Sequence, residues 1–349
     1  MEQSAKKRIG FIDAMRGMTM FLVVVAHVMT FGLGINAEKS ILGSVLITFR
    51  MPVFFLISGF VAYKTIEKFS TRLYFSTIWK KIIALLIPTI VFFCFACIIK
   101  GGNPMSEFMA NGFKEYWFMI VLFEIFLIYL TFSLLLKLFG AKDIAMDIVL
   151  IALVVLSWYF YFYKFFYINT GIRRVFSIGK LVNYFQYFAV GVFFRKYWQQ
   201  IHTFFRKDLV KTLAIILFSV LMIIIWKTHW TASNILAYKI IHDVVVRYMG
   251  LIVFFMIFLT NEEYFESNGK FSNILKLIGK RTMDIYLIHY FFLPDIKFLT
   301  PSLTGNINIV LEILVVVVMS ALIIGVSLGV SYILRRSGFL AHYLFGEKR

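Results

Sequence analysis

Apolar residues along the chain gather into ten long runs that are separated by short polar turns. A helix needs roughly 20 consecutive apolar residues to cross a bilayer, and most of the runs come close to that length. The runs cover residues 14–35, 42–63, 81–99, 116–136, 144–163, 180–195, 211–230, 247–261, 282–298 and 307–334. The pattern predicts an all-α fold, a polytopic membrane helix bundle of about ten transmembrane helices, with residues 1–349 forming one integral-membrane domain.

The distribution of Lys and Arg predicts the orientation of this bundle. The chain starts with basic residues, and every second turn after the first run is again basic. Cytoplasmic loops carry such an excess, so we expect a multi-pass protein of the cell (inner, cytoplasmic) membrane with both termini in the cytoplasm. One predicted outside loop breaks the rule with four basic residues: Lys164, Arg173, Arg174 and Lys180. Either a span is miscounted, or these residues form a lipid-facing patch, or they face an anionic extracellular substrate.

Composition narrows the class of protein further. Of the 349 residues, 61% are hydrophobic and 15% charged, whereas soluble domains carry about 25% charged residues. A sizeable soluble catalytic domain is therefore excluded, and any chemistry must occur among the helices. The net charge of +18 comes from basic residues that flank apolar runs, so it indicates the lipid bilayer as partner and no nucleic acid. Cys94 and Cys97 lie within an apolar run, where we interpret them as packing residues and not as a redox pair.

Two prolines fall inside predicted spans. Pro52 and Pro88 each lack a backbone N–H, so each is expected to bend its helix and to need compensation from neighbouring protein. Bent helices in a bundle usually border a cavity.

Ionisable residues inside the runs are the candidates for function, because each costs at least about 2.5 kcal/mol to place in a membrane. Arg16 and His27 are eleven residues apart, which puts them on one helix face about 16 Å apart. Arg50, Glu124 and His289 are expected at the depth of His27 on three other helices. For each there is a structural alternative: a buried His bridging helices, or an Arg50–Glu124 ion pair.

Several motifs resemble the integral-membrane acyltransferase family three. Residues 8–17 (RIGFIDAMRG), followed by His27 ten residues after Arg16, are similar to the family's Arg–ten residues–His motif on the first helix. Residues 49–60 (FRMPVFFLISGF) resemble its Met-Pro-x-Phe-Phe-x-x-Ser-Gly signature. Weaker similarities are Lys80-Lys81 before Pro88, residues 116–118 (YWF), and residues 286–289 (YLIH).

This resemblance implies an enzyme that moves an acyl group, usually acetyl from acetyl-CoA, onto a hydroxyl of a cell-surface or lipid-linked sugar. The chain resembles in particular the sugar O-acetylases of the fucose 4-O-acetylase type and the exopolysaccharide acyltransferases of this family. The acyl-CoA would be a donor substrate, so no tightly bound cofactor and no metal site are expected. Many relatives have His where this chain has Arg50, which cannot act as a base but can hold an anion or an oxyanion.

The candidate residues supply what acyl transfer from a thioester needs. His27 is the expected base, or the carrier of an acyl-imidazole, and His289 is a second acid or base. Arg50 would polarise the thioester carbonyl, and Glu124 would orient an imidazole or balance the charge of Arg50. The remaining candidates are binding residues for the CoA phosphates (Arg16, Lys80 and Lys81) and for the sugar ring (Tyr116 and Trp117). The two aromatic residues are equally typical of an interfacial belt.

A transporter or flippase for a glycan or lipid-linked sugar is the alternative, with the buried charges lining its pathway. The chain has no paired half-sequences with matching broken helices, which would indicate inverted repeats. This absence favours the enzyme.

Overall fold

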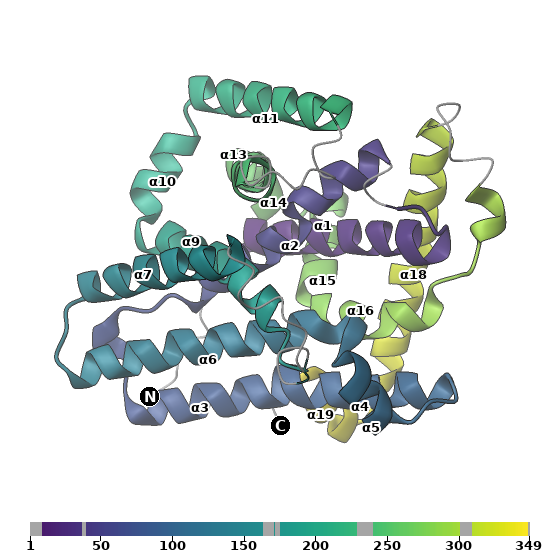
Figure 1. Cartoon of the computed structure of the whole chain (residues 1–349), viewed down its shortest axis with the longest axis horizontal. Helices are drawn as coiled ribbons and strands as arrows, with labels where there is room; N and C mark the ends of the chain where they lie inside the picture. The colour runs from purple at the N-terminus through teal and green to yellow at the C-terminus, as the bar shows by residue number, and fades with distance from the viewer. Residues whose placement is uncertain are drawn as a thin grey trace. The chain divides into compact units, whose positions relative to one another are not determined.

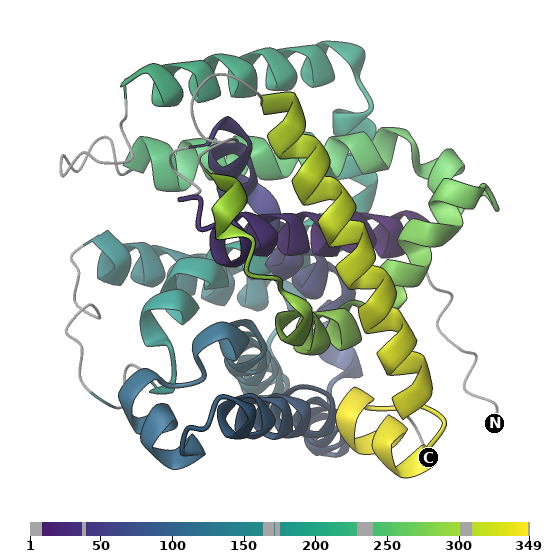
Figure 2. The same ribbon diagram turned by 90° about the vertical axis from the view of Figure 1, so that its right-hand side faces the viewer.

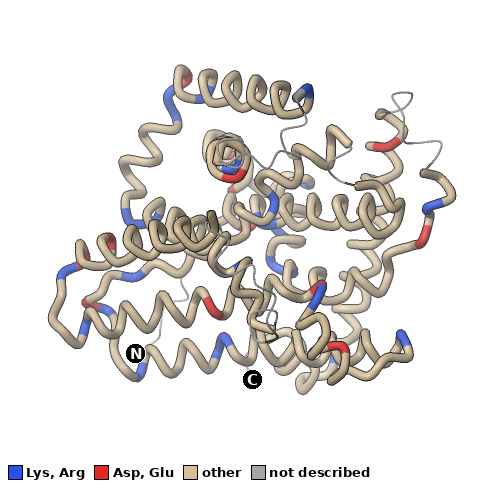
Figure 3. The backbone as a smooth tube through the Cα atoms, in the orientation of Figure 1, with Lys and Arg blue, Asp and Glu red and all other residues tan. Residues whose placement is uncertain are grey.

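The computed structural model describes residues 9–36, 40–162, 171, 175–228, 240–300 and 309–347. Every regular element in these ranges is helical, which confirms the predicted all-α membrane bundle (Figure 1). Lys164, Arg173 and Arg174 of the predicted basic outside loop lie outside the described residues. Lys and Arg, Asp and Glu lie mostly at helix ends and in the connections (Figure 3). The apolar runs thus form the helices, and most charges lie where the helices end.

Most of the predicted runs correspond to long helices, and short helices lie between several of them. The α-helices are α1 (Gly10–His27), α2 (Ile41–Ala62), α3 (Thr71–Lys81), α4 (Ile87–Ile99), α5 (Pro104–Asn111), α6 (Trp117–Leu138), α7 (Asp143–Phe162), α9 (Ile178–Lys196), α10 (Trp198–Phe205), α11 (Asp208–Thr228), α13 (Arg247–Thr260), α14 (Glu262–Glu266), α15 (Lys270–Lys280), α16 (Thr282–Ile288), α18 (Ile309–Leu334) and α19 (Gly338–Phe345). The π-helical turns are η1 (Val28–Gly32), η4 (Ile82–Leu86) and η7 (Ile241–Val246), and they continue α1, join α3 to α4, and precede α13. Pro52 lies inside α2, and Pro88 is the second residue of α4, which directly follows the π-helical turn η4 in the continuous helical segment Thr71–Ile99.

Eight helical segments in the described part of the chain are long and apolar enough to cross a membrane. They are Gly10–Gly32, Ile41–Ala62, Thr71–Ile99, Lys114–Leu138, Asp143–Phe162, Asp208–Lys227, Ile241–Thr260 and Ile309–Leu334. The sixth predicted run forms α9, whose end turns contain Lys180, Arg195 and Lys196. The ninth run does not form one helix: α16 is seven residues long and passes into a 3₁₀ turn, η8 (His289–Phe292), shortly before Pro294.

Contacts divide the chain into two compact units. Unit 1 comprises Met1–Phe54 and Tyr197–Gly329, and unit 2 comprises Phe55–Lys196 and Val330–Arg349. The α2 and α18 helices contribute residues to both units.

In unit 1, α1 packs against α15 at a glycine crossing. A Cβ atom at Gly17 would lie 2.0 Å from the backbone oxygen of Leu275, and one at Gly279 would lie 1.8 Å from that of Asp13. Only glycine permits backbones to approach this closely. The two glycines therefore set the distance between α1 and α15.

The N-terminus of α1 is capped by a residue far away in sequence. Glu266 Oε1, at the end of α14, accepts hydrogen bonds from the backbone N–H groups of Gly10 (2.6 Å) and Phe11 (3.3 Å). These N–H groups have no partner inside the helix, and a carboxylate also suits the positive end of the helix dipole. The cap thus fixes where α1 begins along its neighbour.

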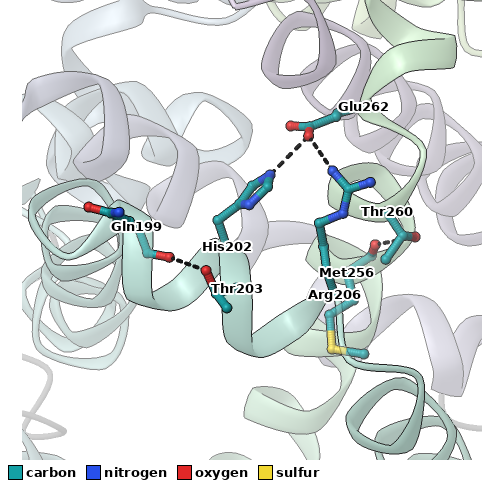
Figure 4. Close-up of polar contacts among 7 residues, drawn as sticks. All are labelled: Gln199, His202, Thr203, Arg206, Met256, Thr260 and Glu262. Atoms are coloured by element: carbon teal, nitrogen blue, oxygen red, sulfur yellow. Dashed lines mark hydrogen bonds and ion pairs between the residues drawn. The ribbon is translucent and has the colours of Figure 1, made fainter.

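Helices α10 and α14 of unit 1 are joined by a polar cluster (Figure 4). Glu262 Oε1 lies 2.9 Å from both His202 Nε2 and Arg206 Nη1. The Trp198 ring of α10 stacks on Phe11 of α1, with 5.8 Å between ring centroids. Figure 2 shows the same helices in a view turned by 90°. The start of α1 is thus enclosed by α10 and α14.

In unit 2, α2 and α9 meet at a second pair of glycines. A Cβ at Gly59 or at Gly191 would lie 2.0 Å from the backbone oxygen of Phe188 or Leu56, respectively. Helix α9 is held to α7 by Lys196, whose Nζ lies 2.6 Å from Asp147 Oδ2, and by the Trp158 indole N–H, which donates to Gln186 Oε1 at 2.7 Å. The α9 helix is thereby fixed on two sides.

Candidate functional site

His27 is the last residue of α1, and the π-helical turn η1 follows it directly. π-helical turns are rare and frequently lie at functional sites. The imidazole is half-buried. It is therefore sheltered from bulk solvent but not sealed off.

His27 contacts His289. The sequence predicted only that the two residues lie at the same depth in the bundle. His27 Nδ1 lies 2.8 Å from His289 Nε2. The two rings are stacked, with 5.1 Å between centroids and 7° between planes. His289 begins the 3₁₀ turn η8 and is 0% exposed. The ninth predicted run therefore changes from α-helix to 3₁₀ turn at His289, the residue that contacts His27.

The hydrogen bonds of His289 determine which nitrogen of His27 is basic. His289 Nδ1 lies 2.8 Å from the backbone oxygen of Ile285, which can only accept, so Nδ1 must carry the proton. In a neutral His289, Nε2 is then an acceptor, and it receives a hydrogen bond from His27 Nδ1–H. A neutral His27 therefore has its lone pair on Nε2. This assignment follows from the partners present, as tautomers generally must.

Tyr290 completes the surroundings of His27. Its hydroxyl lies 3.4 Å from His27 Nε2, and its ring centroid lies 5.0 Å from that of His27. The tyrosine O–H can donate a hydrogen bond to the lone pair on Nε2, so that Nε2 has a partner until a substrate hydroxyl replaces the tyrosine. Tyr290 is not among the residues predicted from the sequence, although its place directly after His289 was a usable signal.

The arginines of unit 1 occupy different positions around this pair. Arg50, on α2, is half-buried and acts electrostatically on the His27 imidazole. Arg16 is 28% exposed at its side chain, and its Nη1 lies 3.7 Å from Asp13 Oδ1. The unit thus brings His27 and His289 into contact, places Arg50 within electrostatic range of His27, and keeps Arg16 eleven residues away from His27 on the same helix.

The other predicted site residues belong to unit 2. Glu124 lies in α6, and neither of its carboxylate oxygens, both buried, has a hydrogen-bond partner among the described residues. Lys80 is exposed at the end of α3, while Lys81 lies with its Nζ 3.6 Å from the centre of the Phe126 ring. Both lysines directly precede the π-helical turn η4.

Tyr116 and Trp117, the aromatic residues predicted to bind the sugar ring, differ in burial. Tyr116 is only 2% exposed, so its ring does not form part of an open surface. Trp117 is half-buried and stacks on Tyr184 of α9, with 5.3 Å between ring centroids. Of the two, Trp117 is the one that keeps an accessible edge for a ligand.

The described residues contain no group of three or more His, Cys, Asp or Glu side chains that could hold a metal ion. Residues 9–335 match the family model whose description is acyltransferase domain. No match was found among curated proteins or among solved structures.

Proposed function

The chain belongs to acyltransferase family 3 and is thus a multi-pass membrane acyltransferase. We propose that it transfers an acyl group, with acetyl as the expected group, from acyl-CoA to a hydroxyl of a cell-surface or lipid-linked sugar. The observation that carries this proposal is the ordered pair of histidines in unit 1. A hydrogen-bonded His289 leaves Nε2 of His27 as the basic atom, and acyl transfer to a hydroxyl requires such a base.

The reaction follows from these atoms. His27 Nε2 removes the proton from the sugar hydroxyl while the hydroxyl oxygen attacks the carbonyl carbon of the thioester. The tetrahedral intermediate carries its negative charge on the former carbonyl oxygen, which the guanidinium of Arg50 stabilises. The intermediate then expels the CoA thiolate, which takes the proton back from Nε2. One ester and one thiol result, and His27 ends neutral, as it began.

His289 acts through His27 in this proposal. Its hydrogen bond holds the His27 ring in one tautomer, and it favours the imidazolium that forms when Nε2 takes a proton. A carboxylate performs the same service in hydrolase triads. His289 is therefore a positioning residue in this proposal, and not the second acid or base expected from the sequence.

The donor and the location complete the proposal. Arg16 lies about 16 Å from His27 along α1, which is of the order of an extended pantetheine arm, so Arg16 would bind the phosphates of acyl-CoA. Lys80 and Lys81 remain predicted phosphate ligands of unit 2. This donor site agrees with termini on the cytoplasmic side of the inner membrane, where acyl-CoA is available.

The experiment is an assay of CoA release by the purified chain in detergent, with acetyl-CoA as donor and lipid-linked and free sugars as acceptors. A positioned base contributes roughly 10²- to 10⁴-fold in rate. His27→Ala should therefore lose at least 99% of turnover, and His27→Gln should not restore it. His342→Ala is the matched control, because His342 lies in α19 of unit 2 and should be dispensable.

Two results would contradict the proposal. CoA release that His27→Ala leaves above about a tenth of wild type would be too high for a lost base. A chain that moves a labelled sugar lipid across vesicle membranes but releases no CoA would instead support the transporter alternative. His289→Ala should lower kcat and leave KM for acetyl-CoA unchanged, because the hydrogen bonds of His289 are to His27 and to the backbone oxygen of Ile285, and neither group is proposed to bind acetyl-CoA.

A further inference from the structure

We propose that Tyr290 is a further catalytic residue, whose hydroxyl donates a hydrogen bond to the oxyanion of the tetrahedral intermediate. This inference rests on the proposed function, because acyl transfer is the reaction that forms such an intermediate. Tyr290 belongs to the 3₁₀ turn η8 of unit 1, directly after His289, and its side chain is half-buried.

The hydroxyl of Tyr290 lies beside the atom at which the reaction begins. Tyr290 Oη is 3.4 Å from His27 Nε2, the nitrogen that takes the proton of the acceptor hydroxyl in the proposed reaction. That hydroxyl must itself lie about 2.6–3.2 Å from Nε2. Its oxygen becomes bonded to the carbonyl carbon of the thioester, and the oxyanion is bonded to the same carbon. A phenol that shares Nε2 with the acceptor hydroxyl is therefore within hydrogen-bonding reach of the negative charge that develops.

The O–H of Tyr290 changes its partner when the acceptor binds. In the ligand-free protein it donates to His27 Nε2 over 3.4 Å, which is long for a hydrogen bond. The acceptor hydroxyl takes this place at Nε2, so the phenol needs a new acceptor, and the carbonyl oxygen of the thioester supplies one. That oxygen gains negative charge during the attack, and hydrogen bonds to charged acceptors are roughly twice as strong as neutral ones. The bond therefore strengthens in the transition state, which raises kcat and not merely the affinity for substrate.

Contacts with four rings hold the Tyr290 side chain in place. Its ring centroid lies 4.1 Å from that of His289 and 5.0 Å from that of His27. Tyr286 and Phe31 each contribute a ring at 6.2 Å. Such contacts between aromatic rings favour a defined ring orientation. A donor that is already oriented needs no reorganisation when the negative charge appears, and this makes stabilisation of an oxyanion effective.

The backbone near Tyr290 is also fixed relative to His27. The turn η1 follows His27, and the chain after η8 is hydrogen-bonded to the end of that turn. The Ile296 N–H donates to the backbone oxygen of Gly32 at 2.9 Å. A Cβ at Gly32 would lie 3.1 Å from the backbone oxygen of Pro294, so the two segments pack backbone to backbone. The segments that carry His27 and Tyr290 are thus joined directly, which keeps the phenol beside Nε2.

Arg50 and Tyr290 act differently on the oxyanion. Arg50 supplies a positive charge, which acts electrostatically on the His27 imidazole, whereas Tyr290 supplies a directed hydrogen bond. Because the two contributions are separate, loss of the phenol should slow the reaction strongly while the base and the charge remain.

The test is Tyr290→Phe, which removes the hydroxyl and keeps the ring. Release of CoA by the purified protein in detergent is measured with acetyl-CoA as donor and with the lipid-linked and free sugars of the activity assay as acceptors. Loss of one oxyanion donor costs roughly 10²- to 10³-fold in kcat, so we expect a fall of about 100-fold or more. KM for either substrate should not rise, because an interaction made only in the transition state lowers kcat alone. Thermal unfolding should occur at the wild-type temperature.

The pH dependence of kcat separates a direct role of Tyr290 from an action through His27. The profile of kcat reports ionisations in the enzyme–substrate complex, in which the acceptor hydroxyl has replaced the phenol at Nε2. The midpoint of that profile should therefore be the same for Tyr290→Phe and for wild type. A phenol that acted only by tuning the base would shift the midpoint when it is removed.

Tyr286→Phe is the matched control. It removes one hydroxyl from a ring one helical turn earlier, which contacts the rings of His289 and Tyr290 at 6.1 and 6.2 Å between centroids. This variant should keep most of the wild-type kcat, whatever its effect on the unfolding temperature. A loss of kcat as large as that of Tyr290→Phe would show that any change in this aromatic group slows the reaction, and it would overturn the role of Tyr290.

Four results with Tyr290→Phe would also overturn the inference. A kcat above about a tenth of wild type would be too high for a lost oxyanion donor. A higher KM for the sugar with an unchanged kcat would make Tyr290 a binding residue, and a shifted midpoint of the kcat profile would make it a positioning residue. A lower kcat together with a lower unfolding temperature would indicate a structural role.

The proposed function is tested separately in the same assay. It survives each of these results if CoA release by the wild-type protein still depends on His27. The absence of CoA release from the wild-type protein with every acceptor would contradict both the proposed function and the role of Tyr290.

Discussion

Replacing Gly279 with Ala should disrupt catalysis from a position that contacts no substrate. A Cβ there would lie 1.8 Å from the Asp13 backbone oxygen, whereas real Cβ atoms essentially never approach closer than 3.0 Å. The α1 and α15 helices must therefore separate by at least about 1.2 Å, the difference between these distances. The same shift would stretch the His27–His289 hydrogen bond from 2.8 Å to about 4 Å, which is beyond hydrogen-bonding range.

The expected effects are on both stability and rate. Overpacking of this kind costs about 1–3 kcal/mol, and misplacement of a catalytic group by about 1 Å can cost 10²-fold in rate. Thermal unfolding and CoA release of the Gly279→Ala protein in detergent measure the two effects. Gly325→Ala is the matched control, because no described atom lies within 4 Å of its Cβ position and it sits in helix α18. That variant should be as stable as wild type or slightly more so.

A Gly279→Ala protein that kept more than half of wild-type turnover with an unchanged unfolding temperature would contradict this prediction. It would then follow that α1 and α15 can adjust without moving the histidines. A loss of turnover in Gly325→Ala of equal size would equally contradict it, since any helical glycine would then be sensitive.

Two further predictions concern α1. Arg16→Ala should raise KM for acetyl-CoA well above any change in KM for the sugar, because Arg16 is the proposed ligand of the donor phosphates. Steady-state kinetics with each substrate varied would check this, and a selective loss of sugar affinity would contradict it. Glu266→Ala should destabilise the protein by about 0.5–2 kcal/mol, the usual range for a lost helix cap, because it removes the acceptor for two backbone N–H groups of α1. Denaturant unfolding measures this loss of stability. Glu263→Ala, on the same helix, is the control and should cost less.

The sequence predicted most helices because most apolar runs have charged or polar ends. Helices α6, α7 and α18 begin and end within a few residues of the predicted runs. Helix α15 was missed because Lys270, Lys276 and Lys280 made it resemble a loop. Its buried face contains Ser272, Leu275, Ile278 and Gly279, with the spacing of one helix face, and it packs along α1. Average hydropathy does not register such a face, whereas the helical period does.

The site was predictable only as far as single helices determine it. The spacing of Arg16 and His27 follows from the helical rise alone. The contact of His27 with His289 depends on α1 lying beside the α15–α16 segment, and on the 3₁₀ turn that starts at His289. Neither can be read from one sequence. The orientation of His289 depends on a backbone oxygen, that of Ile285, and no residue type reveals such a partner.

The contacts between α1 and the α15–α16 segment also restrict changes in chain length. The two stretches run in the same direction and touch at Gly17 with Gly279 and again at His27 with His289. Each pair of contacts is separated by ten residues on both stretches. An insertion of one residue between Gly17 and His27 would turn the imidazole by about 100° and advance it by about 1.5 Å. A matching insertion between Gly279 and His289 would be needed to restore the pair. Descendants of this sequence should therefore gain or lose residues in these two stretches together, and tolerate single insertions far better in the turns outside them.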